Sequence, residues 1–354
     1  MNNIERIKRA LSEYRLDAII VTDPVNRLFA TGFHSSAGAL LVTQRDARFF
    51  TDSRYIEAAA FSITNATVNK VTNESPYADQ IKTMLAEHGI SSIGFEENSV
   101  SYLEYLDWKR KLKIKMIRAQ KLLNVLRMAK SAEDLDSMKK AQRISEKSFE
   151  EILPLINTNM TEKDISAELQ YKFLKNGADG KSFDTIVLSG AKSSMPHGVP
   201  GDVNIGEGFL TIDFGVRLNG WCSDTTRTLC IGKPDEEMVR IYDTVLMAQE
   251  AGIKAARAGV AASEVDAAGR SVIEKAGYGE YFGHGFGHGI GLEVHESPSA
   301  SIISKDTLAA GAVISAEPGI YLPGRYGVRI EDVLYITESG SENITKLTKN
   351  LIIL

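Results

Sequence analysis

The sequence has little cysteine, no long hydrophobic run and no excess of basic residues, and each of these absences excludes a class of protein. Only Cys222 and Cys230 occur among its 354 residues. They fall in one expected strand and would lie about 26 Å apart at ~3.3 Å per residue, which is beyond disulfide reach. We therefore expect buried thiols in a reducing compartment, not a fold held by disulfides.

Membrane and nucleic-acid-binding proteins are the next classes that the composition disfavours. No run approaches the ~18 apolar residues of a membrane span. The formal net charge is -5 and the basic residues are scattered among acids, so no basic surface for nucleic acid is expected. The first residues follow the pattern of an amphipathic helix and not that of a signal peptide. We expect a cytoplasmic protein with no membrane and no nucleic-acid partner.

The chain is long enough for two domains, because single cores rarely grow beyond ~250–300 residues. In residues 1–123, short apolar strands alternate with helical patterns, which predicts a smaller α/β domain. Residues 124–354 instead show two pairs of long helices, each followed by strands. This repeated order predicts an α+β domain with pseudo-twofold symmetry.

The most unusual segment is GHGFGHGIGLEVHE at residues 283–296, which holds three of the six histidines. Glycine occupies every second position from 283 to 291, and each would cost a helix about 1 kcal/mol, so a strand is expected. The spacing does not fit the dinucleotide-binding pattern GxGxxG. In a strand, His284, Phe286 and His288 share one face and the bare face invites close approach of other backbone. The two histidines would lie about 13 Å apart, so at most one is expected to bind metal.

Four carboxylates stand in otherwise apolar strands, where burial without a partner would be costly. A hairpin loop of either four or two residues would place Asp213, in FLTIDFGV, on the same face as Asp224. Glu317 and Glu331 are equally spaced about Gly324, so an odd-length loop would set them face to face. Adjacent anions need a shared proton or a cation between them.

Two carboxylate pairs and His288 would balance the charge of two divalent cations. Mixed oxygen and nitrogen ligands suit Mn, Co, Fe or Zn better than Ca. Each piece alone has a plainer explanation, since an isolated acid in a strand, or an isolated histidine such as His197, is more often ordinary surface. Arg329 shares the face of Glu331, and pairing with a carboxylate and contact with substrate are equally open roles for it.

These residues resemble the pita-bread metallopeptidases, which include aminopeptidase P, Xaa-Pro dipeptidase (prolidase) and methionine aminopeptidase. The resemblance rests on Asp213, Asp224, GHGIGLEVHE with His288, EPGIY with Glu317, and GVRIED with Glu331. It implies that these five residues bind two metal ions, manganese being expected first and cobalt, zinc or iron as alternatives. Residues 1–123 resemble the creatinase-type N-terminal domain of the proline-specific branch, which disfavours methionine aminopeptidase.

The resemblance also implies roles for other side chains. His197, in the segment HGVP, would contact the substrate near the scissile bond, and His295 would stabilise the tetrahedral intermediate. Glu317 would shuttle a proton as well as bind metal, and Arg329 would act beside it. The residues expected to bind substrate are His284, Phe286 and Tyr321.

We therefore expect an exopeptidase that hydrolyses Xaa-Pro bonds of short peptides with a hydroxide that bridges two metal ions. Ser299-Ala300-Ser301 stand where typical prolidases carry an arginine for the dipeptide carboxylate, so aminopeptidase and dipeptidase activities both stay open. A homodimer is expected from the resemblance alone. The alternatives are an inactive binding module on the same fold, a metal-free amidinohydrolase of the creatinase type, and another aminopeptidase specificity. The complete ligand set disfavours the first two.

Overall fold

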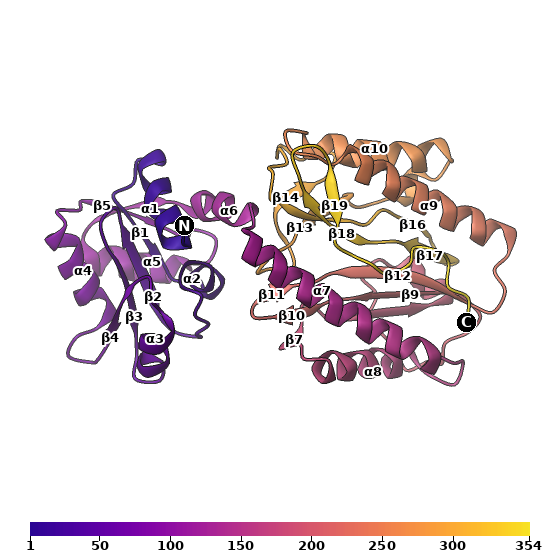
Figure 1. Cartoon of the computed structure of the whole chain (residues 1–354), viewed down its shortest axis with the longest axis horizontal. Helices are drawn as coiled ribbons and strands as arrows, with labels where there is room; N and C mark the ends of the chain where they lie inside the picture. The colour runs from indigo at the N-terminus through magenta and orange to yellow at the C-terminus, as the bar shows by residue number, and fades with distance from the viewer. The chain divides into compact units, whose positions relative to one another are not determined.

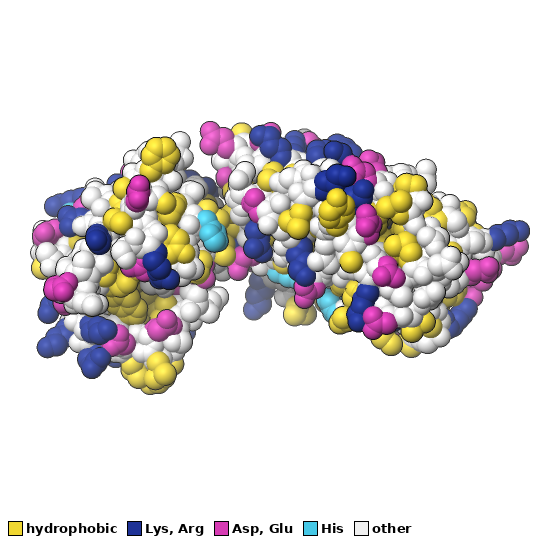
Figure 2. Space-filling model, turned by 90° about the horizontal axis from the view of Figure 1, so that it is seen from below, with side chains coloured by type: hydrophobic (Ala, Val, Ile, Leu, Met, Phe, Trp, Pro, Cys, Tyr) yellow, Lys and Arg dark blue, Asp and Glu magenta, His cyan; other side chains and the backbone are white.

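The computed structural model describes residues 1–354 and divides into two compact units, Met1–Arg127 and Met128–Leu354. Each unit has its own sheets and core (Figure 1). The domain boundary predicted after residue 123 stays a prediction. Basic and acidic side chains are interspersed on the face drawn in Figure 2, as their scatter in the sequence indicates. None of the helices combines the length and apolarity needed to cross a membrane.

The N-terminal unit is built on a six-stranded sheet with the order β4-β3-β2-β1-β5-β6. Its strand β1 is buried at every position, because the sequence AIIV is apolar throughout. The helix after β1 begins at Asp23, whose carboxylate accepts two backbone N–H groups, and ends at Gly32 with a left-handed φ of 73°. The elements are α1 (Asn3–Glu13), β1 (Ala18–Val21), α2 (Pro24–Thr31), β2 (Ala39–Thr43), β3 (Ala47–Thr51), α3 (Ile56–Ser62), β4 (Thr67–Lys70), α4 (Tyr77–Glu87), β5 (Ser92–Phe95), α5 (Tyr102–Leu112), β6 (Lys115–Arg118) and α6 (Gln120–Met128).

Two helix pairs enclose the strands of the C-terminal unit, and Figure 1 shows them on opposite sides of these strands. Ser131 and Thr161 open the first two helices with capping boxes. Asp235 caps the third helix. The helices are α7 (Ala132–Ile152), α8 (Glu162–Lys175), α9 (Glu236–Ala255) and α10 (Ala262–Lys275), with short 3₁₀ turns η1 (Leu153–Leu155), η2 (Gly190–Ser194) and η3 (Gly279–Tyr281).

The strands of this unit form four small sheets, with the orders β11-β10-β7, β12-β9-β8, β14-β13-β15-β18-β19 and β16-β17. Their paired strands are antiparallel, so hairpins and their turns set which side chains meet. The strands are β7 (Gly180–Lys181), β8 (Ile186–Ser189), β9 (Gly208–Phe214), β10 (Val216–Leu218), β11 (Trp221–Cys222), β12 (Thr225–Ile231), β13 (Gly287–Gly289), β14 (Glu296–Ala300), β15 (Val313–Ala316), β16 (Gly319–Leu322), β17 (Tyr326–Arg329), β18 (Asp332–Ile336) and β19 (Ser341–Asn343).

The predicted internal repeat is visible in equivalent connections of the two halves. Thr161, which precedes α8, forms an isolated β-bridge with Asn204, and Ala261, which precedes α10, forms one with Thr307. In each half a strand follows that bridge, β9 in the first and β15 in the second. Each half then supplies one pair of the carboxylates singled out above.

The glycine-histidine segment is a much shorter strand than the sequence predicted. Only Gly287–Gly289 is strand, and its pairing with β14 shifts register between His288 and Gly289. The close approach expected of the bare backbone is confirmed, since a Cβ at Gly287 would lie 2.0 Å from the Ser315 carbonyl oxygen.

The orientation of the Phe286 side chain differs from the one expected for this segment. Its ring is fully buried between two helices, and a Cβ at Gly252 of α9 or at Gly269 of α10 would lie 2.1 Å or 2.6 Å from it. The prediction that Phe286 shares a face with His284 and His288 is therefore wrong. The alternation fails because the chain is not extended before Gly287, and the large apolar ring turns into the core.

This packing yields a test of the core. In Gly252→Ala the new methyl group would overlap the Phe286 ring, which cannot retreat because Gly269 bounds its other side. Such overpacking costs about 1–3 kcal/mol, while alanine recovers at most ~1 kcal/mol of helix propensity. We expect calorimetry to show a midpoint of unfolding lowered by several degrees. Gly206→Ala, where no atom lies within 4 Å of the new Cβ, is the control, and an unchanged midpoint in both variants would contradict this packing.

Candidate active site

A cavity of about 450 Å³ in the C-terminal unit brings together most of the side chains singled out in the sequence. These side chains come from several strands and loops that are distant in the sequence. Two predicted substrate-binding residues, Phe286 and Tyr321, are not among those that line it. The predicted residues in its wall are His197, Asp213, Asp224, His284, His288, His295, Glu317, Arg329 and Glu331.

The first carboxylate pair is set by a two-residue turn at Asn219–Gly220. With this turn Asp213 lies opposite Thr226 in the pairing of β9 with β12. Asp224 is two residues before Thr226 and therefore on the same face as Asp213. Of the two registers considered, the one that sets Asp213 directly opposite Asp224 is not formed.

The second pair is set by a three-residue turn at 323–325, in which Gly324 has a φ of 73°. The pairs Ala316–Asp332 of β15 and β18 and Gly319–Arg329 of β16 and β17 follow one common register. Glu317 and Glu331 lie between these pairs and face one another in that register. The expected odd-length loop is confirmed.

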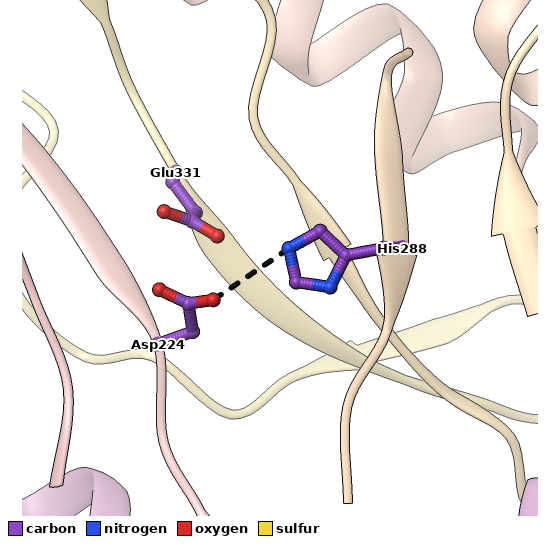
Figure 3. Close-up of side chains that lie close together, drawn as sticks. All are labelled: Asp224, His288 and Glu331. Atoms are coloured by element: carbon purple, nitrogen blue, oxygen red, sulfur yellow. Dashed lines mark ion pairs between the residues drawn. The ribbon is translucent and has the colours of Figure 1, made fainter. Parts of the chain in front are cut away.

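His288 points at both carboxylate pairs from β13. Its Nδ1 lies 3.1 Å from the Gly289 carbonyl oxygen, a contact that would hold a proton on Nδ1 and leave Nε2 to bind a metal ion when one is present. That Nε2 lies 3.2 Å from Glu317 Oε1 and 3.6 Å from Asp224 Oδ2. Figure 3 shows Asp224, His288 and Glu331 converging from three separate segments, and one atom of each lies within 4.8 Å of the others.

The charges of this cluster fit divalent cations. Burial, followed by repulsion from Glu331, raises the pKa of Asp224 well above its usual value. Burial and Glu317 raise the pKa of Glu331 in the same way. Asp213 Oδ1 and Glu331 Oε1 are buried with no hydrogen-bond partner, which is rare for carboxylate oxygens. Carboxylates with an imidazole are the donors that Mn, Co, Fe and Zn prefer, so these residues fit such ions.

Glu317 differs from the other carboxylates of the cluster. Burial opposes its ionisation, but a hydrogen bond from His288 together with the charges of His288, His284 and Arg329 outweighs burial and lowers the pKa of Glu317 to about 2. The Ser315 hydroxyl also donates to Glu317 Oε1 at 3.0 Å. The same hydroxyl accepts the backbone N–H of His288 at 2.9 Å, so one serine positions both side chains.

Arg329 is buried and fixes the carboxylate cluster through hydrogen bonds. Its Nη2 donates to Asp213 Oδ2 at 2.6 Å and its Nε to the Thr226 hydroxyl at 3.0 Å. Thr226 in turn donates to Glu331 Oε2 at 2.8 Å. Of the two roles considered for Arg329, carboxylate pairing is the one that the contacts display.

Tyr321 does not line the cavity itself but contacts two residues that do. It is buried, and its hydroxyl lies 3.0 Å from Arg329 Nη1 and 2.8 Å from His284 Nε2. The other nitrogen of His284 lies 2.8 Å from the Gly285 carbonyl oxygen. Both nitrogens of His284 are therefore engaged, and the ring is fixed in its orientation.

Arg227 is a supporting residue that the sequence reasoning missed. It is 1% exposed, its Nη2 donates to Asp332 Oδ1 at 2.7 Å, and its Nη1 donates to the backbone oxygen of Glu331 at 2.5 Å. It thereby fixes the backbone from which Glu331 projects. The available signal was an arginine in a strand that continues as Leu229, Cys230 and Ile231, where burial of an unpaired guanidinium would be costly.

His295 lies at the exposed side of the cavity, with its ring centre 4.2 Å from that of His288. The next residue, Glu296, accepts a hydrogen bond from Lys130 Nζ at 2.6 Å, and both of these side chains are buried. Gly291 makes room for this pair, because a Cβ there would lie 2.3 Å from Glu296 Oε1. This ion pair anchors the chain directly after His295.

Several other residues of the cavity wall were not predicted. Ile186 of β8 lies opposite Asp213 in the pairing of β8 with β9, so it shares the face of that carboxylate. The two strands are separated by residues 190–207, and no hairpin turn in the sequence fixes their register. The missed lining residues are Phe183, Asp184, Ile186, Pro196 and Val294, and the wall also includes Ser299 and Ser301, which were singled out in the sequence.

Comparison with known proteins gives two family matches. Residues 136–338 match the model of metallopeptidase family M24, and residues 3–129 match the creatinase/prolidase N-terminal domain. Together they account for both units of the fold.

Individual relatives span the whole chain. An uncharacterized peptidase, YqhT, of Bacillus subtilis is 37% identical over 99% of both chains. A solved Xaa-Pro dipeptidase from Bacillus anthracis is 39% identical, covers 99% of both chains and has a TM-score of 0.96. A solved X-Pro aminopeptidase from Thermotoga maritima is 35% identical, covers 98% of this chain and 100% of its own, and has a TM-score of 0.92.

The resemblance read from the ligand motifs is thus confirmed, as is the fold of a creatinase-type N-terminal domain followed by a pita-bread domain. The chain belongs to metallopeptidase family M24 and is a metallopeptidase.

Proposed function

We propose that the protein is a dinuclear metal-dependent exopeptidase that hydrolyses Xaa-Pro bonds in short peptides. The observation that carries the proposal is the convergence of three buried carboxylates, the partly buried Glu317 and His288 in one cavity. The names of the similar Xaa-Pro dipeptidase and X-Pro aminopeptidase support the preference for proline.

The proposed ligands of two metal ions are Asp213, Asp224, His288, Glu317 and Glu331, with manganese as the metal expected first. Bound there, two divalent ions would lower the pKa of a water between them and polarise the scissile carbonyl group. The homodimer and the cytoplasmic location stay predictions.

The residues around the ligands have separate tasks. Glu317, anchored by His288 and Ser315, is placed to hold a proton and to pass it to the leaving nitrogen. His295, exposed beside His288, is placed to donate a hydrogen bond to the oxygen on which negative charge develops. His197, in the cavity wall, would contact the substrate near the scissile bond.

The other candidate functions fit the site less well. An inactive binding module has no need of a complete set of acidic and imidazole donors in one buried cluster, since such a cluster costs stability. A metal-free amidinohydrolase would leave the repulsion among these carboxylates uncompensated. Both would bind no metal, so metal analysis of the purified protein separates them from the proposal.

Asp224→Asn tests the metal centre. The substitution keeps the shape but removes a charge from between two proposed cations, so metal content and peptidase activity should fall together. Asp184→Asn, at the cavity mouth and not among the proposed ligands, should leave metal content unchanged. Elemental analysis and activity are measured on the same preparations. Retained activity with less than one metal ion per chain would overturn the dinuclear assignment.

His295→Ala separates chemistry from metal binding. The variant should keep its metal but lose roughly 10²–10³-fold in kcat, as expected for one donor to a developing oxyanion. His295→Gln, which retains a side-chain N–H donor, should recover part of this loss. Loss of metal from His295→Ala would show that His295 binds metal and would contradict its assignment to the substrate.

Proline specificity is the decisive experiment for the proposed function. The proline nitrogen carries no N–H, so selection of proline depends on the shape of the apolar wall, to which Phe183, Ile186 and Val294 contribute. Replacing proline by alanine in an otherwise identical peptide should lower kcat/KM at least ~100-fold, the upper range for apolar pockets. Comparable rates on Ala-Pro-Ala and Ala-Ala-Ala would refute the proline preference and leave the metallopeptidase standing.

A further inference from the structure

We propose that Glu162, a buried carboxylate at the start of α8, positions His197 for the reaction by holding together the two ends of the loop that carries this histidine. The inference rests on the proposed function, in which His197 contacts the substrate near the scissile bond. Glu162 does not line the cavity, so its role is that of a positioning residue that acts through the loop.

The ring of His197 has no anchor of its own. It is exposed in the cavity wall and makes no hydrogen bond, whereas both nitrogens of His284 are engaged. The position of the His197 ring therefore depends on the path of the chain between β8 and β9. A displacement of about 1 Å at a reacting group can cost ~100-fold in rate, so a histidine in this place needs a firmly held backbone.

Glu162 reaches both ends of the His197 loop from the first turn of α8. Its Oε1 accepts the backbone N–H of Ser189, the last residue of β8, at 2.8 Å. Its Oε2 accepts the backbone N–H of Gly201 at 2.7 Å and the Nζ of Lys192, inside the loop, at 2.6 Å. One side chain thus closes the loop at its neck, and closely spaced ends are typical of an Ω-loop.

The burial of Glu162 makes these contacts important. Its side chain is 6% exposed, and an ionised carboxylate that has left water requires donors for its oxygens. The donors all come from the loop or its two ends, and hydrogen bonds to a charged acceptor are about twice as strong as neutral ones. Gly201 permits the close approach, since a Cβ there would lie 3.0 Å from Lys192 Nζ.

The two neighbours of His197 lie against the body of the unit. The carbonyl oxygen of Pro196 lies 3.4 Å from Arg329 Nη1. On the other side, a Cβ at Gly198 would lie 2.7 Å from Leu188 Cδ2. Both close approaches require the loop to keep its path, and the closed neck determines that path.

A second ion pair joins the same helix to the same end of the loop, but at the surface. Lys163 Nζ lies 2.7 Å from Asp202 Oδ2, and both side chains are more than half exposed. Exposed pairs of this kind contribute little to stability. Asp202→Asn is therefore the matched control for a substitution at Glu162.

Glu162→Gln keeps the size of the side chain but replaces one acceptor oxygen by an NH₂ donor. In either orientation of the amide this donor faces a backbone N–H, that of Ser189 or that of Gly201, so one end of the neck opens. Hydrogen exchange of residues 190–201 should be faster in this variant and unchanged in Asp202→Asn. Unchanged exchange in Glu162→Gln would refute the inference, whatever the activity of the variant.

Kinetics on Ala-Pro-Ala with the metal-loaded full-length enzyme test whether Glu162 acts through His197. Glu162→Gln should lower kcat/KM roughly 10-fold, mainly through kcat, with metal content unchanged and with a loss no larger than that of His197→Ala. In the His197→Ala background the same substitution should have no further effect, because the residue that it positions is gone. Additive losses would contradict the inference, since Glu162 would then act elsewhere.

Lys192→Met is a second variant, which keeps both backbone contacts of Glu162 and removes its partner cation. It should lower kcat/KM several-fold and should also have no effect in the His197→Ala background, so the test holds even where Glu162→Gln does not fold. Wild-type protein that does not cleave Ala-Pro-Ala would overturn the proposed function and the inference together. Wild-type rates in both variants would overturn the inference alone.

Discussion

Repulsion among four clustered carboxylates, three of them buried and Glu317 partly buried, is the constraint on which the C-terminal unit depends. Asp213, Asp224, Glu317 and Glu331 project into one cavity from two hairpins, and burial raises the energy of each charge. The protein supplies one guanidinium, that of Arg329, and gives it to Asp213. The remaining anions can be held together only by protons or by cations, and the imidazole of His288, a ligand that suits transition metals, favours cations.

The rest of the unit keeps these charges in place. Arg329, Thr226 and Glu331 form a chain of hydrogen bonds, so the position of one carboxylate depends on the contacts of another. Arg227 and Asp332 hold the backbone behind Glu331 in the same manner. Only Asp213 and His288 lie within strands. The other ligands, Asp224, Glu317 and Glu331, lie in the short gaps between strands, contrary to the expectation that all four carboxylates stand in strands, so these contacts supply the rigid support that a reactive site needs.

The ligand set could be read from the sequence because short turns determine it. Asn219–Gly220 and the turn around Gly324 fix the registers of two hairpins, and each register decides which carboxylates share a face. The orientation of Phe286 could not be read in this way, since strand alternation applies only where the chain is extended. The contacts of Arg227, and the place of Ile186 opposite Asp213, depend on segments joined by long connections, for which no local rule gives a register.

A similar distinction applies within the site, between the residues proposed to bind metal and the other residues of the cavity wall. The ligand positions depend on one another through charge balance, because loss of one carboxylate or of His288 changes the electrostatic environment of all the others. Ser299 is not part of that balance, although it lies opposite His288 in the neighbouring strand. Such a position contributes no atom to the proposed ligand set. The charge balance therefore constrains the ligand positions more tightly than it constrains the strand that pairs with β13.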